Sequence, residues 1–166
     1  ETAAAAAEEA LEVRVNVETT AVARRLAKGE PVPRPLTAKC PQLVLPPNAG
    51  IKEIGTNALS NHGILNSITL PAGTVTIQDG AFFRCKHLQS VTFPNGVATI
   101  GNAAFADCSS LAELTIPACA TQIYPHAFFR CSQLTSVTMP NSLTNIGGGA
   151  YSLCDCLTRI NLPAAL

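Results

Sequence analysis

The sequence predicts a solenoid, an α/β repeat fold in which short parallel strands and short helical or 3₁₀ turns wind into a right-handed coil. Three observations predict it. Proline recurs at one spacing of 23 residues, at Pro71, Pro94, Pro117, Pro140 and Pro163. Apolar residues recur in fixed columns between these prolines. One such unit is too short to bury its own apolar face, whereas stacked units bury a continuous core.

Five columns repeat with little change along the chain. They comprise isoleucine (Ile77, Ile100, Ile123, Ile146), alanine (Ala81, Ala104, Ala127, Ala150), an aromatic (Phe82, Phe105, Phe128, Tyr151), leucine (Leu88, Leu111, Leu134, Leu157) and cysteine (Cys85, Cys108, Cys131, Cys154). Upstream, Ile54, Ala58 and Leu59 continue the first three columns, and His62 stands at the cysteine position. Residues 43–46 read as the strand end of one more, degenerate unit. The chain therefore divides into five repeats over 48–163 and part of another.

Each unit predicts two extended pieces and one turn. Val91 and Phe93 alternate with polar residues, as in a strand, and Pro94 closes that strand because proline cannot donate to a ladder. The β-branched stretch 97–100 favours a second extended piece. The spacing of Ala104, Phe105 and Cys108 suits one helical or 3₁₀ turn. Stacking should place neighbouring coils about 4.8 Å apart where strands pair.

The run from Ile100 to Cys108 (Ile-Gly-Asn-Ala-Ala-Phe-Ala-Asp-Cys) resembles the repeat of the BspA-like leucine-rich-repeat proteins. The resemblance covers about 48–163 and departs from the pattern at Leu59, His62 and Tyr151. It implies a curved solenoid used for adhesion or protein binding, often at microbial cell surfaces, with no catalytic residues and no cofactor. A cell-surface or secreted location follows from this resemblance, and a subunit of an intracellular complex is the alternative.

Residues 1–47 differ from the repeats that occupy 48–166. The stretch 3–11 is rich in Ala and Glu and favours helix, Val13, Val15 and Val17 alternate as in a strand, and 20–28 suits a helix ended by Gly29. A proline-rich linker follows at 30–35. Two interpretations stand: an N-terminal cap over the open end of the solenoid, or an independent docking arm.

Composition excludes several classes of protein. The chain carries eleven basic and eleven acidic residues, so it has no net charge, and only 13% of its residues are charged. A nucleic-acid binder needs a basic surface, which this composition does not predict. No run of 18 apolar residues predicts a membrane span. The chain begins with Glu1 rather than Met, so we expect it to be a piece of a longer protein.

The cysteines and histidines do not predict a catalytic or metal site. Four of the seven cysteines stand one per coil, which predicts small buried side chains with free thiols. Cys119 and Cys156 fall in polar columns and should be more exposed. The histidines, at positions 62, 87 and 126, occupy three different columns. We therefore expect no enzyme, no metal and no cofactor.

The candidate partner-binding residues lie where the repeat pattern is broken. Arg84, Asp107 and Arg130 share one column and should form a surface row of alternating charge. Phe83 and Phe129 share the adjacent column, where they either present binding side chains or pack between turns. The outward strand positions complete the set: Thr92, Thr115, Thr138, Glu113 and Arg159.

The area of the strand face is too small for this face to form a stable interface alone. Five strands about 4.8 Å apart, each about four residues long at about 3.3 Å per residue, give roughly 300 Å². A standard interface takes about 800 Å² from each partner. Binding must therefore recruit a flank, the N-terminal segment, further repeats or several copies. The sequence predicts a protein-interaction or adhesion module whose partner is another protein, or alternatively a structural subunit held among neighbours in a larger assembly.

Overall fold

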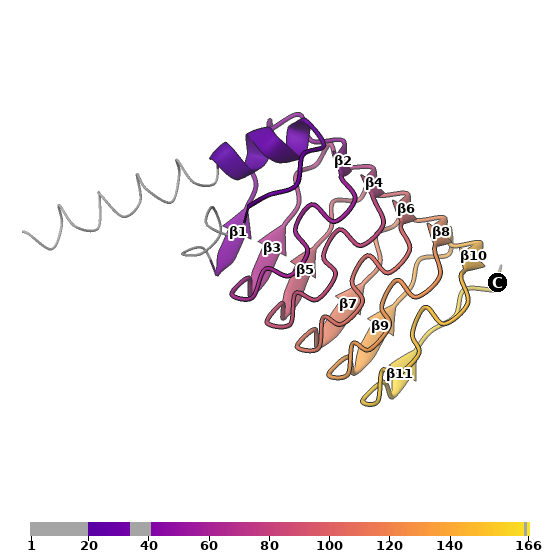
Figure 1. Ribbon diagram of the computed structural model, residues 1–166. Coiled ribbons are helices and arrows are strands. Elements are labelled where there is room, and N and C mark those ends of the chain that lie inside the picture. The colour runs from indigo at the N-terminus through magenta and orange to yellow at the C-terminus, as the bar shows by residue number, and fades with distance from the viewer. Residues whose placement is uncertain (1–19, 34–40, 165) are drawn as a thin grey trace, which may run out of the picture.

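The computed structural model describes residues 20–33, 41–164 and 166, and over them the chain winds into a solenoid with two rows of parallel strands (Figure 1). The first row contains β1 (Gln42–Val44), β3 (Ser67–Thr69), β5 (Ser90–Thr92), β7 (Glu113–Thr115), β9 (Ser136–Thr138) and β11 (Arg159–Ile160). The second row contains β2 (Glu53–Ile54), β4 (Thr76–Ile77), β6 (Thr99–Ile100), β8 (Gln122–Ile123) and β10 (Asn145–Ile146). This arrangement confirms the predicted solenoid.

The strand register confirms the columns read from the sequence. In the second row Ile54 pairs with Ile77, Ile77 with Ile100, and each further step again joins two isoleucines. In the first row Leu43 pairs with Ile68, so the degenerate unit before the first full repeat does contribute the strand β1. Because each pairing is parallel and in register, every core position of one coil lies beside the same position of the next.

The first strand row is interrupted once, whereas the second row is continuous. β2, β4, β6, β8 and β10 form one five-stranded sheet, but the first row forms two three-stranded sheets, β1-β3-β5 and β7-β9-β11. Strands β5 and β7 remain neighbours and lie farther apart than the paired strands of the same row (Figure 1). The sequence predicted one continuous face here, so this interruption is a departure from the expected fold.

The expected helical or 3₁₀ turn takes the form of consecutive hydrogen-bonded turns. Alternate residues bond within the coil, as where the Ala104 N–H donates to the Gly101 carbonyl at 3.3 Å. The residues between them donate to the next coil, as where the Phe105 N–H donates to the Ala127 carbonyl at 2.7 Å. The turn segments therefore form a ladder of their own, which accounts for backbone groups that a helix would have satisfied internally.

Two columns of these turns have a left-handed backbone. One runs through Asn57, Gly80, Ala103, His126 and Gly149, with φ between 50° and 68°. The other runs through Asn61, Arg84, Asp107, Arg130 and Leu153, with φ of 58° or 59°. Most of these residues are not glycine, so the fold holds them in a conformation that disfavours L side chains. The left-handed residues Ala103 and Asp107 stand four positions apart, and the N–H groups of both donate to the next coil, to the carbonyls of Pro125 and Phe129.

The core lies between the two strand rows and is filled by the predicted columns. Phe82, Phe105 and Phe128 are fully buried, and their rings stack with centroids 4.8 Å and 5.3 Å apart. Tyr151 continues the stack 5.3 Å beyond Phe128. Stacked aromatic rings at this spacing combine a large buried apolar area with favourable ring geometry.

The cysteine column is fixed by hydrogen bonds to the backbone of the preceding coil. Each thiol donates to a carbonyl of the preceding coil, three residues before the cysteine position of that coil. The Cys85 sulfur lies 3.0 Å from the Leu59 oxygen, in the coil that has His62 at this position, and the Cys108 sulfur lies 3.2 Å from the Phe82 oxygen. Burial raises the pKa of the Cys85 thiol to about 11 and also raises the pKa values of Cys108, Cys131 and Cys154. These cysteines are therefore structural side chains, as the sequence predicted.

The described part of the N-terminal segment packs on the first coil. A helix covers 20–27 and lies over the end of the solenoid (Figure 1). Val22, Ala23 and Leu26 are buried in the same core cluster as Ile51 and Ile54. The expected helix over 3–11, the expected strand over 13–17 and the end of the proline-rich linker lie outside the described residues.

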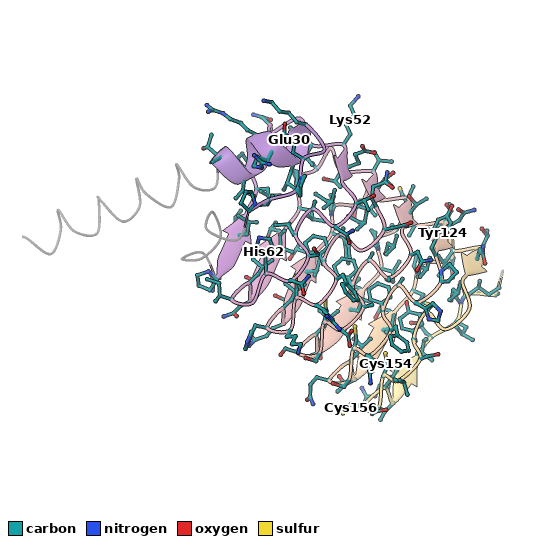
Figure 2. The ribbon with its side chains drawn as sticks, in the orientation of Figure 1. Glu30, Lys52, His62, Tyr124, Cys154 and Cys156 are labelled. Carbon is teal, nitrogen blue, oxygen red and sulfur yellow. The ribbon has the colours of Figure 1, made fainter. Side chains whose placement is uncertain are left out.

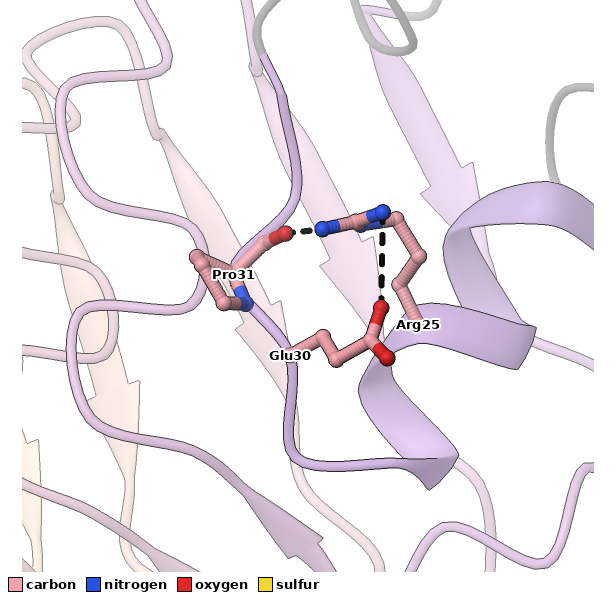
Figure 3. A network of polar contacts seen from close by, with 3 residues as sticks. All are labelled: Arg25, Glu30 and Pro31. Carbon is pink, nitrogen blue, oxygen red and sulfur yellow. Dashed lines mark hydrogen bonds and ion pairs between the residues drawn. The ribbon is translucent and has the colours of Figure 1, made fainter.

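Arg25 fastens the turn that follows this helix. Its Nε donates to the Pro31 carbonyl at 2.8 Å, and its Nη1 lies 3.4 Å from the Glu30 carboxylate (Figure 3). Gly29 has a φ of 68°, the left-handed conformation that ends a helix, which agrees with the stop predicted there. The Val32 N–H then donates to the Ala58 carbonyl at 2.8 Å and joins the segment to the repeats.

Candidate protein-binding surfaces

The first candidate surface is the turn column that carries Phe83, Arg84, Phe129 and Arg130. The Arg84 guanidinium lies 5.2 Å from the centre of the Phe83 ring, and the Arg130 guanidinium lies 5.7 Å from the centre of the Phe129 ring. Both phenylalanines are half-buried and both arginines are exposed. Two cation–π pairs therefore stand on coils that are separated by one coil.

The coil between these pairs contributes Ala106 and Asp107. Ala106 is only 2% exposed, as expected for a small side chain in the column where Phe83 and Phe129 flank it on either side. The Asp107 carboxylate lies 3.8 Å from Arg84 Nε, whereas Arg130 has no ion pair among the residues described. The expected row of alternating charge thus contains one ion pair and one arginine that rests on an aromatic ring. Phe83 and Phe129 each pack partly between the turns and remain partly exposed, so both expected alternatives apply to them.

A shallow groove of about 400 Å³ adjoins this column. Positive and negative side chains alternate along it, separated by serines, and it is lined by Lys86, Asp107, Ser109, Arg130, Ser132, Leu153 and Asp155. The left-handed backbone at Asp107, Arg130 and Leu153 belongs to the column described above, so rigid turns position these side chains. A groove with balanced charge suits a polar protein surface better than a simple anion or cation.

Tyr124 and His126 lie between the second strand row and Phe129, on the coil that carries the second cation–π pair. Tyr124 follows β8 directly and is 45% exposed, and the His126 ring meets the Phe129 ring edge-on at 5.5 Å. Figure 2 shows Tyr124 beside the second strand row, well away from Cys156 near β11. Tyr124 was not among the predicted residues, although it replaces glycine (Gly55, Gly101, Gly147) in a column where Gln78 is the other non-glycine residue. Aromatic and arginine side chains of this kind dominate the energetics of protein interfaces.

The second candidate surface is the outer face of the first strand row. Thr92, Thr115 and Thr138 are exposed in the predicted row, although the row is split between Thr92 and Thr115. Glu113 and Arg159 are exposed and lie on either side of Ser136, so they are not nearest neighbours, and neither takes part in an ion pair within the described part of the chain. Asn161 ends this face by pairing its side-chain amide with both backbone groups of Met139.

A groove of about 490 Å³, which was not predicted from the sequence, lies over the carboxyl ends of β5, β7 and β9. Apolar and threonine side chains and one asparagine line it, and the set is Val91, Thr92, Phe93, Asn95, Thr115, Ile116, Pro117, Ala118, Thr138, Met139 and Pro140. The only signal in the sequence was Phe93 itself, a large ring in a column that otherwise holds aliphatic side chains.

The histidines and the remaining cysteines lie apart from one another. His62 is buried with its Nδ1 3.2 Å from the Ser60 carbonyl, whereas His87 and His126 are exposed in other columns. Cys119 and Cys156 are exposed free thiols, as predicted, and Figure 2 shows Cys156 and Cys154 near β11. Across residues 20–33, 41–164 and 166, no three His, Cys, Asp or Glu side chains gather to hold a metal ion. No helix in the described ranges combines the length and hydropathy of a membrane span.

Comparison with protein families gives a match over most of the chain. The family described as "BspA type Leucine rich repeat region" matches residues 52–166 in six copies. The expected resemblance to this type of repeat is therefore confirmed. No curated protein matches the chain.

Solved structures of bacterial leucine-rich-repeat proteins share the fold. A leucine-rich cell surface protein of Faecalibacterium prausnitzii is 35% identical, with a TM-score of 0.69, over 73% of this chain and 31% of its own. The leucine-rich-repeat protein of T. pallidum is 32% identical, with a TM-score of 0.72, over 74% of this chain and 58% of its own. The pneumococcal vaccine antigen PcpA, at 22% identity and a TM-score of 0.63, shares the fold alone. The chain thus spans about a third of the first of these proteins and somewhat over half of the second.

Proposed function

Because the chain belongs to the BspA-type leucine-rich-repeat family, we propose that it is a non-catalytic interaction or adhesion module whose partner is another protein. The observation that carries this proposal is the pair of cation–π contacts, Arg84 on Phe83 and Arg130 on Phe129. They present four side chains of the types that anchor interfaces, on turns whose backbone is fixed by bonds to the neighbouring coils.

The binding surface combines this turn column with its groove and with the strand face. Thr92, Thr115 and Thr138, with Glu113 and Arg159, provide hydrogen-bonding groups on the strand face. Our area estimate gives that face roughly 300 Å², which falls short of the about 800 Å² that a standard interface takes from each partner. The turn column would extend this surface and would add the aromatic anchors.

The setting we propose is a cell surface. The F. prausnitzii protein, 35% identical to this chain, is described as a cell surface protein, and it shares the repeat over 73% of this chain. Antibody labelling of intact cells, with and without permeabilisation, tests this setting. Labelling only after permeabilisation contradicts it.

A four-residue variant tests the binding surface. The change Phe83→Ala, Arg84→Ala, Phe129→Ala and Arg130→Ala removes both cation–π pairs, while Gln133→Ala with Asn141→Ala is a matched control at exposed polar positions. We expect a partner isolated with the natural chain to bind the four-residue variant at least tenfold more weakly and the control equally well. Equal binding to all three chains, each shown to be folded by circular dichroism, contradicts the proposal.

The alternative function is a permanent structural subunit, and one observation favours it. The last coil leaves apolar side chains exposed, with Ile160 at 41% and Leu162 at 64%. Residues in the same columns of an inner coil, Leu114 and Ile116, are 3% exposed. Either further repeats or a neighbouring subunit would bury this surface. Light scattering at micromolar concentration decides between the two, because a stable monomer counts against a permanent subunit.

We further propose that 20–33 caps the first coil, and that it is not an independent arm. Val22, Ala23, Leu26 and Val32 are buried in the common core, and a docking arm would leave them free. Deletion of residues 1–33 should then lower the free energy of unfolding and leave partner binding unchanged at temperatures where the chain is folded. Loss of the partner without loss of stability supports the docking-arm interpretation.

A further inference from the structure

The groove beside the turn column carries charges in an order that is complementary to its own reverse. Lys86 and Asp155 share one column, in which two serines lie between them. Asp107 and Arg130 are neighbours in a column two positions earlier in the repeat. Along the solenoid, the charges that line the groove therefore run positive, negative, positive, negative, one on each coil. In the opposite direction the order is negative, positive, negative, positive, so each charge meets one of opposite sign.

Three of these four charges have no partner of opposite sign in their own chain. Lys86, Arg130 and Asp155 are exposed, and none of them takes part in an ion pair within the ranges that the structure describes. The Oδ2 atom of Asp107 lies 3.8 Å from Arg84 Nε, and the second oxygen of this carboxylate can accept from another cation. The groove therefore has a full set of charges that can pair with a second molecule.

The side chains beside the groove follow the same reversal in size. Their column holds Phe83, Ala106, Phe129 and Ser152, so large rings alternate with small side chains. Reversal sets each ring opposite a small side chain, because Phe129 meets Ala106 and Phe83 meets Ser152. Both rings are half-buried, so a part of each is available for contact. Shape and charge thus favour the same arrangement.

We propose that a second copy of the chain binds this surface, antiparallel to the first. A two-fold axis that crosses the solenoid between the coils of Asp107 and Arg130 brings each column against the same column of the other copy. Lys86 then faces Asp155 of the second copy, and Asp107 faces Arg130 of the second copy. The symmetry doubles both pairs. This inference rests on the proposed function as an interaction module and names the partner.

A parallel arrangement of the two copies is disfavoured by the same charges. It would set each coil against the same coil of the second copy. Lys86 and Arg84, which stand on one coil, would then face the cations of that coil, and like charges repel. In the antiparallel arrangement, Arg84 faces Leu153 of the second copy. Leu153 is 53% exposed, and the aliphatic part of an arginine side chain can cover it.

The contact between two single copies should be weak and reversible. Four coils about 4.8 Å apart, with a turn segment of about four residues at about 3.3 Å each, give at most roughly 250 Å². A standard interface takes about 800 Å² from each partner. Exposed ion pairs are individually weak and are screened by salt. Many copies on one surface would add such contacts together, as adhesion requires.

Sedimentation equilibrium of the full chain tests whether the dimer forms. The measurement runs to millimolar concentration, with a reductant that keeps Cys119 and Cys156 from forming disulfides between copies. We expect a monomer–dimer equilibrium in low salt that weakens at least tenfold in half-molar salt. A chain that stays monomeric at millimolar concentration in low salt overturns the proposal.

Charge-reversal variants test the pairing of Lys86 with Asp155. Lys86→Asp sets like charges opposite each other at both of these contacts, and so does Asp155→Lys. Each variant alone should associate at least tenfold more weakly than the natural chain. Their equimolar mixture should regain the natural strength, because each chain then carries the charges that the other lacks. A mixture that associates no better than the single variants overturns the proposal.

Lys52→Asp is the matched control, because Lys52 is exposed beside β2 and the change in net charge equals that of Lys86→Asp. This variant should associate within about threefold of the natural chain, since it leaves the proposed contact intact. A mixture of Lys52→Asp with Asp155→Lys carries the same net charges as the complementary mixture. It should stay weaker than that mixture. Equal strength would mean that net charge alone drives association, which overturns the proposal.

A zero-length carbodiimide tests the orientation of the two copies. The reagent joins a lysine amine to a carboxylate that it contacts, and an amide bond forms with loss of water. Within one chain Lys86 and Asp155 stand three coils apart, so only an antiparallel copy brings them together. From mixed ¹⁴N- and ¹⁵N-labelled chains we expect a linked peptide with Lys86 from one isotope and Asp155 from the other. Absence of this product where the dimer is populated overturns the proposal.

The same measurements separate this dimer from the broader function. If the chain stays monomeric while the four-residue variant still loses an isolated partner of another kind, the second copy is wrong and the proposed function stands. If the dimer forms as described while that variant keeps its isolated partner, the dimer stands and the proposed surface for other proteins is wrong.

Discussion

The rings of Phe82 and Phe105 lie face to face, with centroids 4.8 Å apart and planes within 7° of parallel. The same contact is repeated at Phe128 and at Tyr151, so one column of rings runs through coils that are separate in sequence. Each ring is therefore held by the coil before it and the coil after it, which makes the stability of neighbouring coils interdependent.

Removing the central ring of this stack should weaken the whole solenoid. Phe105 is fully buried, so Phe105→Ala should lower the free energy of unfolding by about 3–5 kcal/mol. Phe83→Ala, at a half-buried position, should lower it by less than about 1.5 kcal/mol. Urea unfolding followed by circular dichroism measures both. If Phe105→Ala does not fold, Phe105→Leu should show a smaller loss of the same sign, and no loss contradicts a stabilising role for the stack.

The Tyr151 hydroxyl should destabilise the protein. It is buried and has no hydrogen-bond partner among the residues described, and burial raises the pKa of this phenol, so the hydroxyl stays protonated. Tyr151→Phe removes an unsatisfied polar group and restores the residue type of the column. We expect the free energy of unfolding to rise by about 1 kcal/mol. A decrease would show that the hydroxyl has a partner in solution.

Ala103 occupies the left-handed column with a φ of 50°. Ala103→Gly should relieve a conformation that costs an alanine about 1–2 kcal/mol, and the extra entropy of glycine in the unfolded chain should offset part of this gain. The expected net increase in the free energy of unfolding is about 0.5 kcal/mol. Ala104→Gly, at the fully buried position next in the chain, is the control and should destabilise. Thermal unfolding of the two variants under one set of conditions should shift in opposite directions.

The reactivity of each cysteine toward an alkylating reagent should depend on the repeat column in which it lies. Cys119 and Cys156 are exposed, whereas Cys85, Cys108 and Cys131 are buried and have raised pKa values because burial disfavours the thiolate. In a Cys40→Ser background, iodoacetamide should therefore modify Cys119 and Cys156 in the native protein. The buried three should react only in denaturant. Native labelling at Cys108, mapped by mass spectrometry, would be inconsistent with the described core.

The same thiols should make the fold sensitive to alkali. The pKa of Cys85 rises from 9.0 to about 11 on folding, so its contribution to stability is complete below about pH 9 and is lost as the pH rises toward 11. For this residue the loss is roughly 2–3 kcal/mol. Urea unfolding at pH 7 and pH 10.5 should show a smaller difference for Cys85→Ala than for the natural chain. An equal difference would mean that this thiol does not contribute.

Much of the fold follows from periodicity, because each core column needs one residue type at one spacing. Ile77 and Ile100 pair as their columns predicted, and the cysteine column is buried as expected. The backbone of the turns was only partly predictable, because Asn61 and Asp107 are residue types that favour a left-handed conformation, whereas Arg84 and Arg130 in the same column are not. Stacking imposes that conformation on them.

The candidate site was only partly predictable for a similar reason. Phe83 and Phe129 stand out because they break a column, but their partial burial depends on the size of Ala106 between them. Phe93 stands out as a ring in an aliphatic column, but its partial exposure could not be predicted from that. Its edge-on contact is with Phe105, twelve positions away, whose ring is stacked between those of the adjacent coils. A contact that depends on several residues of different coils cannot be read from the pattern of apolar and polar residues along the sequence.

The asymmetry of the two strand rows has a mechanical consequence. A load applied along the long axis pulls neighbouring coils apart, and we expect resistance to be lowest between β5 and β7, where only one of the two strand rows and the ladder of turns join the coils. The continuous row β2 to β10 would still tether the two halves after that side opened. Each coil that then peels away releases 23 residues, or roughly 80 Å of extended chain. Under tension the solenoid would lengthen in steps, one coil at a time, and dissipate mechanical work before its two ends separate.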